Sequence, residues 1–173
     1  MRPIIPDNHL GSCYTFGRWS EYPCRSMKKR MSQDWKEVSA QWVGEMSFIG
    51  KNQSGGRVQM GTIDGQPGTS PMELLLEGVA GCTGIDIVLI LGKKRITLDQ
   101  FEVRVRGKRA DAYPAVYTEI EIEYLIWADD LDPKALEQAI ELSEEKYCSA
   151  SAMLSKTAEM RSGYRILKPG EIA

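Results

Sequence analysis

The stretch "SPMELLLEGVAGCTGIDIVLIL", Ser70 to Leu91, decides the fold of this chain, because it predicts one long helix that is apolar on every face. Ser70 is the expected N-cap, Pro71 takes the first helical position, and Glu73 completes a Ser-x-x-Glu capping box. A helix without a polar face must be covered by protein on nearly all sides. The helix is therefore predicted to lie at the centre of the fold, with Cys82 near its middle, far from either end.

Three glycines, Gly78, Gly81 and Gly84, recur at every third position of this helix. Each glycine costs about 1 kcal/mol relative to alanine in a helix interior, so the repeat needs a structural reason. Close approach of another backbone is the simplest reason, and we expect one here. The helix is predicted to end at Gly92 and the three cations that follow it.

Composition limits the class of protein. The chain has 173 residues, of which 42% are hydrophobic and 27% are charged, as in one ordinary globular domain. A net charge of −2 gives no sign of a nucleic-acid partner. Glu77 and Asp86 within the apolar helix argue against a membrane span. With no secretory signal in view, we expect a cytoplasmic protein whose cysteines are reduced.

The chain divides into three parts. Residues 1–30 show no helical or strand periodicity and contain three prolines, so they are predicted to be a poorly ordered N-terminal extension. Residues 31–168 form the predicted domain, and residues 169–173 form a C-terminal tail. Two cysteines and the single histidine of the chain fall in the extension and are interpreted as incidental: Cys13, Cys24 and His9.

The domain is predicted to be α+β, in the order β-β-α-β-β-α-β with two main helices. A strand in 36–50, bent at Gly44, and a strand in 57–63 form a hairpin before the long helix. A second helix, capped by Asp132 and stapled by Leu131, ends near Cys148. The remaining strands are expected at 99–110, 115–128 and 158–167; in the first two, Arg104 and Arg106 can face the glutamates of the neighbouring strand.

The domain has two cysteines, Cys82 and Cys148, and their 66-residue separation excludes a CxxC motif and a short metal-binding knuckle. A zinc site would need carboxylates to complete it, since the domain lacks histidine, and no phosphate-binding loop is present. We therefore expect no metal and no cofactor. Each cysteine can be a small buried apolar residue. If the two helices pack antiparallel, the pair instead suits a reversible disulfide.

Two segments, "SPMELLLEGVAGCTGIDIV" and "LSEEKYCSASAML", closely resemble the OsmC family, which includes the organic hydroperoxide resistance proteins. The resemblance extends over about residues 36–168 and includes the order of the elements and both cysteines. It implies an OsmC-like fold and an intertwined homodimer, in which the long helices of both chains pack together and the sheets lie outside them.

The resemblance also implies thiol-dependent reduction of organic hydroperoxides, a defence against oxidative stress. Cys82 would be the peroxidatic thiol that becomes a sulfenic acid, and Cys148 would resolve it to a disulfide. An external dithiol, such as a lipoylated protein, would be the reductant. Apolar walls at Leu75, Val79 and Ile85 would favour an alkyl or lipid peroxide over hydrogen peroxide.

One departure from the family pattern concerns activation of the thiol. In the peroxidase branches a Pro-Glu pair opens the helix, and its glutamate holds a strand arginine against the thiolate. Here Met72 takes that position, and Glu73 follows one residue later, a turn of about 100° on a helix. The matching arginine candidate is Arg57, the only arginine of the first hairpin. Glu73 also has the simpler role of completing the capping box.

The predicted catalytic set is therefore Cys82, Cys148, Glu73 and Arg57. Without a nearby cation the pKa of a buried thiol rises, which slows its attack on a peroxide. Met72 thus favours an alternative in the same fold: a small-ligand-binding or redox-sensing protein without peroxidase activity.

Overall fold

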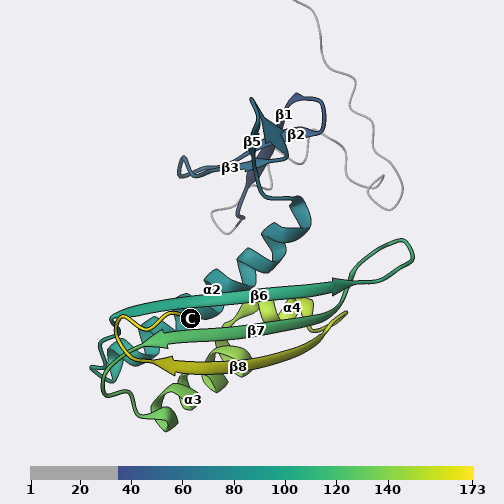
Figure 1. Cartoon of the computed structure of the whole chain (residues 1–173). Helices are drawn as coiled ribbons and strands as arrows, with labels where there is room; N and C mark the ends of the chain where they lie inside the picture. The colour runs from purple at the N-terminus through teal and green to yellow at the C-terminus, as the bar shows by residue number, and fades with distance from the viewer. Residues whose placement is uncertain (1–34) are drawn as a thin grey trace, which may run out of the picture.

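The computed structural model describes residues 35–173, so the predicted extension 1–30 lies outside the described residues. Two three-stranded sheets lie on either side of one long helix, α2, in the chain, and a short two-stranded sheet, β4-β5, precedes the helix (Figure 1). The elements before α2 are β1 (Val38–Gly44), β2 (Ser47–Asn52), β3 (Arg57–Met60), β4 (Thr62–Ile63) and β5 (Gln66–Pro67). From α2 on they are α2 (Pro71–Lys93), β6 (Gln100–Arg109), β7 (Tyr117–Trp127), α3 (Pro133–Leu142), the π-helix η2 (Ser143–Tyr147), α4 (Ser149–Leu154) and β8 (Glu159–Leu167).

The larger sheet has the order β6-β7-β8. β6 and β7 are antiparallel, as the sequence predicts, and β8 runs parallel to β7 after a crossover through α3, η2 and α4. The helices cover one face of this sheet (Figure 1). Alternate residues of β7 point into that face, and the core that forms there includes fully buried side chains from three elements: Val79, Ile87 and Leu91 of α2, Ile120, Tyr124 and Ile126 of β7, and Leu136 of α3.

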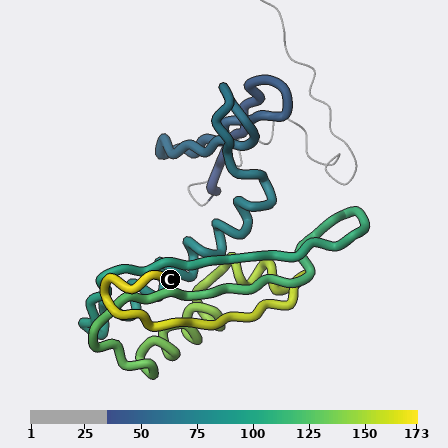
Figure 2. Tube along the Cα trace, in the orientation of Figure 1, coloured from purple at the N-terminus to yellow at the C-terminus, as the bar shows by residue number. Residues whose placement is uncertain are grey.

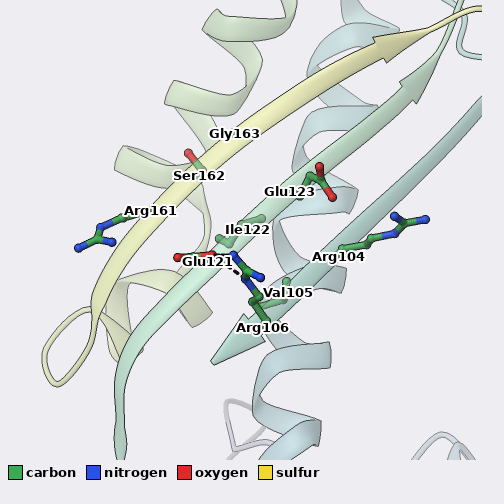
Figure 3. Close-up of a pocket in the computed structure, with 9 residues that line it drawn as sticks. All are labelled: Arg104, Val105, Arg106, Glu121, Ile122, Glu123, Arg161, Ser162 and Gly163. Carbon is green, nitrogen blue, oxygen red and sulfur yellow. Dashed lines mark hydrogen bonds and ion pairs between the residues drawn. The ribbon is translucent and has the colours of Figure 1, made fainter. Parts of the chain in front are cut away.

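The opposite face of the sheet is charged and exposed (Figure 3). Arg106 forms an ion pair with Glu121 across the ladder, as predicted. Arg104 lies opposite Glu123 in register but pairs with Glu102 of its own strand, at 2.8 Å. Exposed ion pairs of this kind contribute at most about 1 kcal/mol each to the stability of the fold. They therefore leave this face solvated and add little to folding.

The start of α2 follows its sequence signals. The Ser70 hydroxyl accepts the Glu73 N–H at 3.2 Å, and the Glu73 carboxylate accepts the Ser70 N–H at 2.8 Å. The helix ends at Lys93 with Lys94 as its C-cap, within the run from Gly92 to Arg95 where its end is predicted. Arg95 takes the left-handed conformation, with φ of 62°, that usually falls to glycine. Its N–H reaches the carbonyl of Gly92 at 2.9 Å.

α2 is covered on one side only within a single chain. Val79, Thr83, Ile87 and Leu91 are buried, whereas Ile85 is 64% exposed and Leu89 58% exposed. By length and composition α2 could span a membrane, a property it shares with core helices of globular proteins. Because α2 packs along β6, α3 and α4, it is a core helix that still has one open face.

The predicted reason for the helix glycines is not found inside one chain. A Cβ added at Gly78 or Gly81 would meet no atom within 4 Å, other than the helix backbone itself. At Gly84 the nearest atom belongs to a side chain, Val103 of β6, at 3.4 Å. Gly78 and Gly81 therefore lie on the open side of α2.

The region before α2 departs most from prediction. The expected single strand in 36–50 is two strands, β1 and β2, because Gly44 and Glu45 both adopt positive φ and reverse the chain. With β3 they form a three-stranded antiparallel sheet. Large apolar side chains of this sheet remain open to solvent, among them Trp42, which is 61% exposed.

The second helix is also divided. Asp132 caps α3 as predicted, accepting the Lys134 N–H at 3.1 Å, but α3 ends at Leu142 and η2 follows. At the other end of the domain, residues after β8 fold back on the sheet. The Trp127 ring N–H donates to the Glu171 carbonyl at 2.7 Å, so the predicted tail 169–173 contacts the domain.

Candidate functional site

The two cysteines of the domain meet where α2 passes η2 and α4. Cys82 is partly exposed, whereas Cys148 is only 2% exposed. Both are free thiols, and they lie close enough that Cys82 is one of the causes raising the pKa of Cys148. The structure therefore brings the two predicted redox residues together from positions far apart in the chain.

The π-helix η2 sets the position of Cys148. The Cys148 N–H donates to the Ser143 carbonyl five residues earlier, at 2.7 Å, which closes the wide turn typical of a π-helix. The Ser143 hydroxyl donates in turn to Asp86 of α2, at 3.0 Å. Since Asp86 lies one helical turn after Cys82, this bond fixes η2 against α2 beside the first thiol.

Ser151 holds the sulfur of Cys148. The Cys148 Sγ accepts the Ser151 N–H at 3.3 Å and the Ser151 hydroxyl at 3.1 Å, so the thiol acts as the N-cap of α4. Ser151 is itself buried, with 5% exposure. Sequence analysis missed this residue, although the run "CSAS" carries the signal: a polar side chain three residues after a possible cap.

The pKa of the buried thiol is affected by its burial, by Ser151 and by Cys82. Burial raises the pKa of Cys148, and the two hydrogen bonds from Ser151 oppose that rise. Glu144 accepts the Tyr124 hydroxyl and the Ser162 hydroxyl, each at 3.1 Å. Burial raises the pKa of Tyr124 as well, and the Glu144 charge adds to the effect. Within residues 35–173, no hydrogen bond links a lysine or arginine to either sulfur.

The other two predicted residues lie away from the thiols of their own chain. Glu73 precedes Cys82 by nine residues, a rise of about 13 Å along a helix. Its carboxylate is occupied by the capping box, and its hydrogen bonds to Ser70 lower its pKa. Arg57 is exposed on β3, which lies beyond the N-terminal end of α2 (Figure 1). Their catalytic roles stay predictions.

The predicted apolar walls separate into two groups. Leu75 and Ile85 are exposed on the open side of α2, at 45% and 64%. Val79 is fully buried in the core and offers no surface to a ligand in a single chain. An apolar substrate could therefore reach the first two side chains but not the third.

The chain is similar in sequence and in fold to several known proteins. Residues 63–162, which include α2 and Cys148, match the family model described as OsmC-like protein. Protein YhfA of Escherichia coli K12 is 33% identical over 131 residues, covering 76% of this chain and 98% of the relative. A solved structure of a hypothetical protein from Aquifex aeolicus VF5 is 35% identical, with a TM-score of 0.70, and covers 79% of this chain and 98% of that one.

The fold is shared more widely. The organic hydroperoxide resistance protein OhrB of Bacillus subtilis superposes with a TM-score of 0.54 over 78% of this chain and the whole of OhrB. Its identity of 18% shows a common fold and no more. The match over residues 63–162 and the likeness to YhfA together show that the chain belongs to the OsmC-like protein family.

Proposed function

We propose that this protein is a thiol-dependent peroxidase that reduces alkyl or lipid hydroperoxides to alcohols, in defence against oxidative stress. The observation that carries the proposal is the pairing of a partly exposed thiol, Cys82, with a buried one, Cys148. The OsmC-like family, whose fold includes organic hydroperoxide resistance proteins such as OhrB, gives independent support. Thiol chemistry of this kind requires a reducing compartment, so we place the protein in the cytoplasm.

The reaction consumes one hydroperoxide and two thiols. The Cys82 thiolate attacks the distal peroxide oxygen and the O–O bond breaks. The departing alkoxide takes up a proton and becomes the alcohol. The Cys148 sulfur then attacks the Cys82 sulfenic acid, a disulfide forms, and water leaves. An external dithiol, for which a lipoylated protein is our candidate, returns two electrons and restores both thiols.

The protein is proposed to act as a homodimer. The sheet β1–β3 stands apart from the larger sheet, at the far end of α2 (Figure 2). Both this sheet and the open side of α2 expose apolar side chains. Burying apolar surface stabilises by about 25 cal/mol per Å². A second copy that packs its own α2 and small sheet on these surfaces would complete the domain.

The homodimer also offers a role for Glu73 and Arg57. Neither reaches Cys82 within one chain, but the N-terminal end of one α2 can lie against the middle of another. We propose that Arg57, oriented by Glu73, stabilises the Cys82 thiolate in the opposite subunit by its positive charge. Arg57→Ala should then slow the first step with peroxide, while the disulfide remains reducible at the normal rate.

A second function is favoured by the same site. The Cys148 sulfur is hydrogen-bonded to Ser151, Met72 stands in place of the family glutamate, and burial raises the pKa of Cys148. These features suit an OsmC-like protein that binds a small ligand or senses redox state without turnover. Such a protein would form the disulfide slowly and would not discriminate between peroxides.

Steady-state turnover separates the two functions. Cumene hydroperoxide should be consumed faster than hydrogen peroxide, first with dithiothreitol and then with a lipoylated reductant. One equivalent should convert two thiols to a Cys82–Cys148 disulfide, seen by mass spectrometry after free thiols are blocked. Cys82→Ser should abolish consumption, and Cys148→Ser should stop at a sulfenic acid that over-oxidises. Consumption no faster than that of a free thiol would leave the ligand-binding or sensing function.

A further inference from the structure

We propose that the external reductant attacks Cys82, and not Cys148, in the Cys82–Cys148 disulfide, and that Ser151 holds the departing Cys148 sulfur as a thiolate. This inference rests on the proposed function, because it concerns the step that regenerates both thiols. It assigns a direction to that step and a role to a residue outside the predicted catalytic set.

Access decides which sulfur can be attacked. Thiol–disulfide exchange requires the incoming thiolate to reach one sulfur while the other leaves. Cys148 is 2% exposed and enclosed between η2 and α4, whereas Cys82 is partly exposed on α2. Within one chain, an incoming thiol therefore has a route to the Cys82 sulfur and none to the Cys148 sulfur.

Hydrogen bonding favours the same direction. The Cys148 Sγ accepts two donors from Ser151, at 3.1 and 3.3 Å, and donors to an ionised sulfur are stronger than donors to a neutral one. The nearby carboxylate of Glu144 is bonded to Tyr124 and Ser162 and supplies no donor to the sulfur. Apart from the Cys148 thiol, whose hydrogen is absent in the disulfide, no side chain in the part of the chain that the structure describes donates to Cys82, so Cys148 is the better leaving group.

In the proposed step, a dithiol reductant with one thiol ionised forms a bond to the Cys82 sulfur. The Cys82–Cys148 bond breaks, and its electron pair leaves on the Cys148 sulfur. The second thiol of the reductant then attacks the mixed disulfide, the reductant is oxidised to its own disulfide, and Cys82 leaves as a thiolate. Each protein thiolate takes up a proton, one of them the proton released by the second reductant thiol.

The direction of attack can be read from the trapped intermediate. The intramolecular disulfide is prepared with diamide, so that this experiment does not require peroxidase activity. The oxidised protein is treated with 2-mercaptoethanesulfonate, a monothiol, then acid-quenched, unfolded, alkylated and mapped by mass spectrometry. We expect the monothiol on Cys82 and the alkyl group on Cys148. The monothiol on Cys148 would overturn the proposal and leave the peroxidase function intact.

The role of Ser151 is tested on the two half-reactions separately. Ser151→Ala should slow reduction of the disulfide by dithiothreitol about tenfold, the effect of losing one hydrogen bond to a charged atom. Oxidation of Cys82 by cumene hydroperoxide should keep its rate. Ser151→Thr retains the hydroxyl and should restore reduction. Ser155→Ala, at an exposed serine at the end of α4, is the matched control.

Three outcomes count against one or both proposals. Equal slowing of both half-reactions by Ser151→Ala would show a structural role and overturn this inference. Failure of diamide to join Cys82 and Cys148 would overturn the inference and the proposed function together. A diamide-formed disulfide in a protein that consumes no hydroperoxide would overturn the proposed function alone, and the mapping experiment would still decide the direction of attack.

Discussion

The two three-stranded sheets of this protein contain similar apolar side chains but bury them to different extents. The sheet β6–β8 turns its apolar residues onto three helices, so that Ile120, Tyr124 and Ile126 are fully buried within one chain. The sheet β1–β3 has apolar residues as well, yet Trp42 is 61% exposed and Val38 76% exposed. One part of the molecule completes its own core, and the other presents surface that a second copy would cover.

The long helix α2 belongs to both parts. Its buried side carries Val79 and Ile87, and its open side carries Ile85 and Leu89 together with the unopposed Gly78 and Gly81. An apolar residue in this sequence therefore does not by itself indicate a place in the core of its own chain. Stability of the two parts should therefore respond differently to protein concentration.

The largest effect is expected from Ile85→Glu, on the open side of α2. If two copies pack there, each dimer loses two buried isoleucines at about 1.5 kcal/mol or more apiece, so the dimer Kd should rise about 100-fold or more. Light scattering at micromolar concentration should show a wild-type dimer and a variant monomer. Ile172→Glu, at a 94% exposed isoleucine in the tail, is the matched control. A monomeric wild type would contradict the prediction.

The next effect concerns the self-contained part. Leu136 of α3 is fully buried, and Leu136→Ala should lower the free energy of unfolding by about 2–5 kcal/mol. Because the lost contacts lie within one chain, we expect this loss to be the same at all protein concentrations, as measured by urea unfolding. A loss that disappears at high concentration would mean that α3 also depends on the second copy.

A smaller effect is expected where the two parts join, at the start of α2. Ser70→Ala removes the hydroxyl that accepts the Glu73 N–H and should cost about 1 kcal/mol in urea unfolding. Glu73→Gln keeps an oxygen that can accept the Ser70 N–H, so its melting temperature should stay near that of wild type. If Glu73→Gln nevertheless slows peroxide consumption, then Glu73 acts on the chemistry and not only as a cap.

The smallest effect is a pH dependence within the buried part. Burial raises the pKa of Cys148, so the unfolded chain loses this proton at lower pH than the folded chain. The contribution of the neutral thiol is complete below the unfolded pKa, about 8.5, and is lost as pH rises towards the folded value. Under reducing conditions, wild type should lose more stability than Cys148→Ser between about pH 8 and pH 10. Parallel pH profiles would contradict the assignment.

The sequence predicts those features that depend on local rules. Ser70 and Asp132 cap the helices at which they were expected, and β6 pairs with β7 in the predicted order, because capping and alternation act over a few residues. The turn at Gly44 was read as a bend because an Ala-Gln-Trp-Val-Gly run gives no sign that Glu45 also takes positive φ. The end of α2 falls within the predicted run 92–95, although the left-handed conformation after it is taken by Arg95 and not by a glycine.

The site was predictable only in part. The family resemblance named Cys82 and Cys148, and the structure brings them together. It did not name Ser151 or Asp86, because their roles depend on how η2 orients the chain, and periodicity does not distinguish a π-turn from an α-turn. The roles proposed for Glu73 and Arg57 involve a second copy, because neither residue reaches Cys82 within one chain.

The wide turn η2 makes the geometry of the candidate site depend on the length of a segment more than on its composition. Its bond from Cys148 to Ser143 accommodates one residue more than an α-helical turn. Deleting the exposed Glu145 would restore the α-helical count and rotate the following residues by about 100°. The Cys148 sulfur would then point away from Cys82, although every reactive residue would still be present. Among homologous chains, the spacing between these two positions therefore carries functional information that residue identity alone does not.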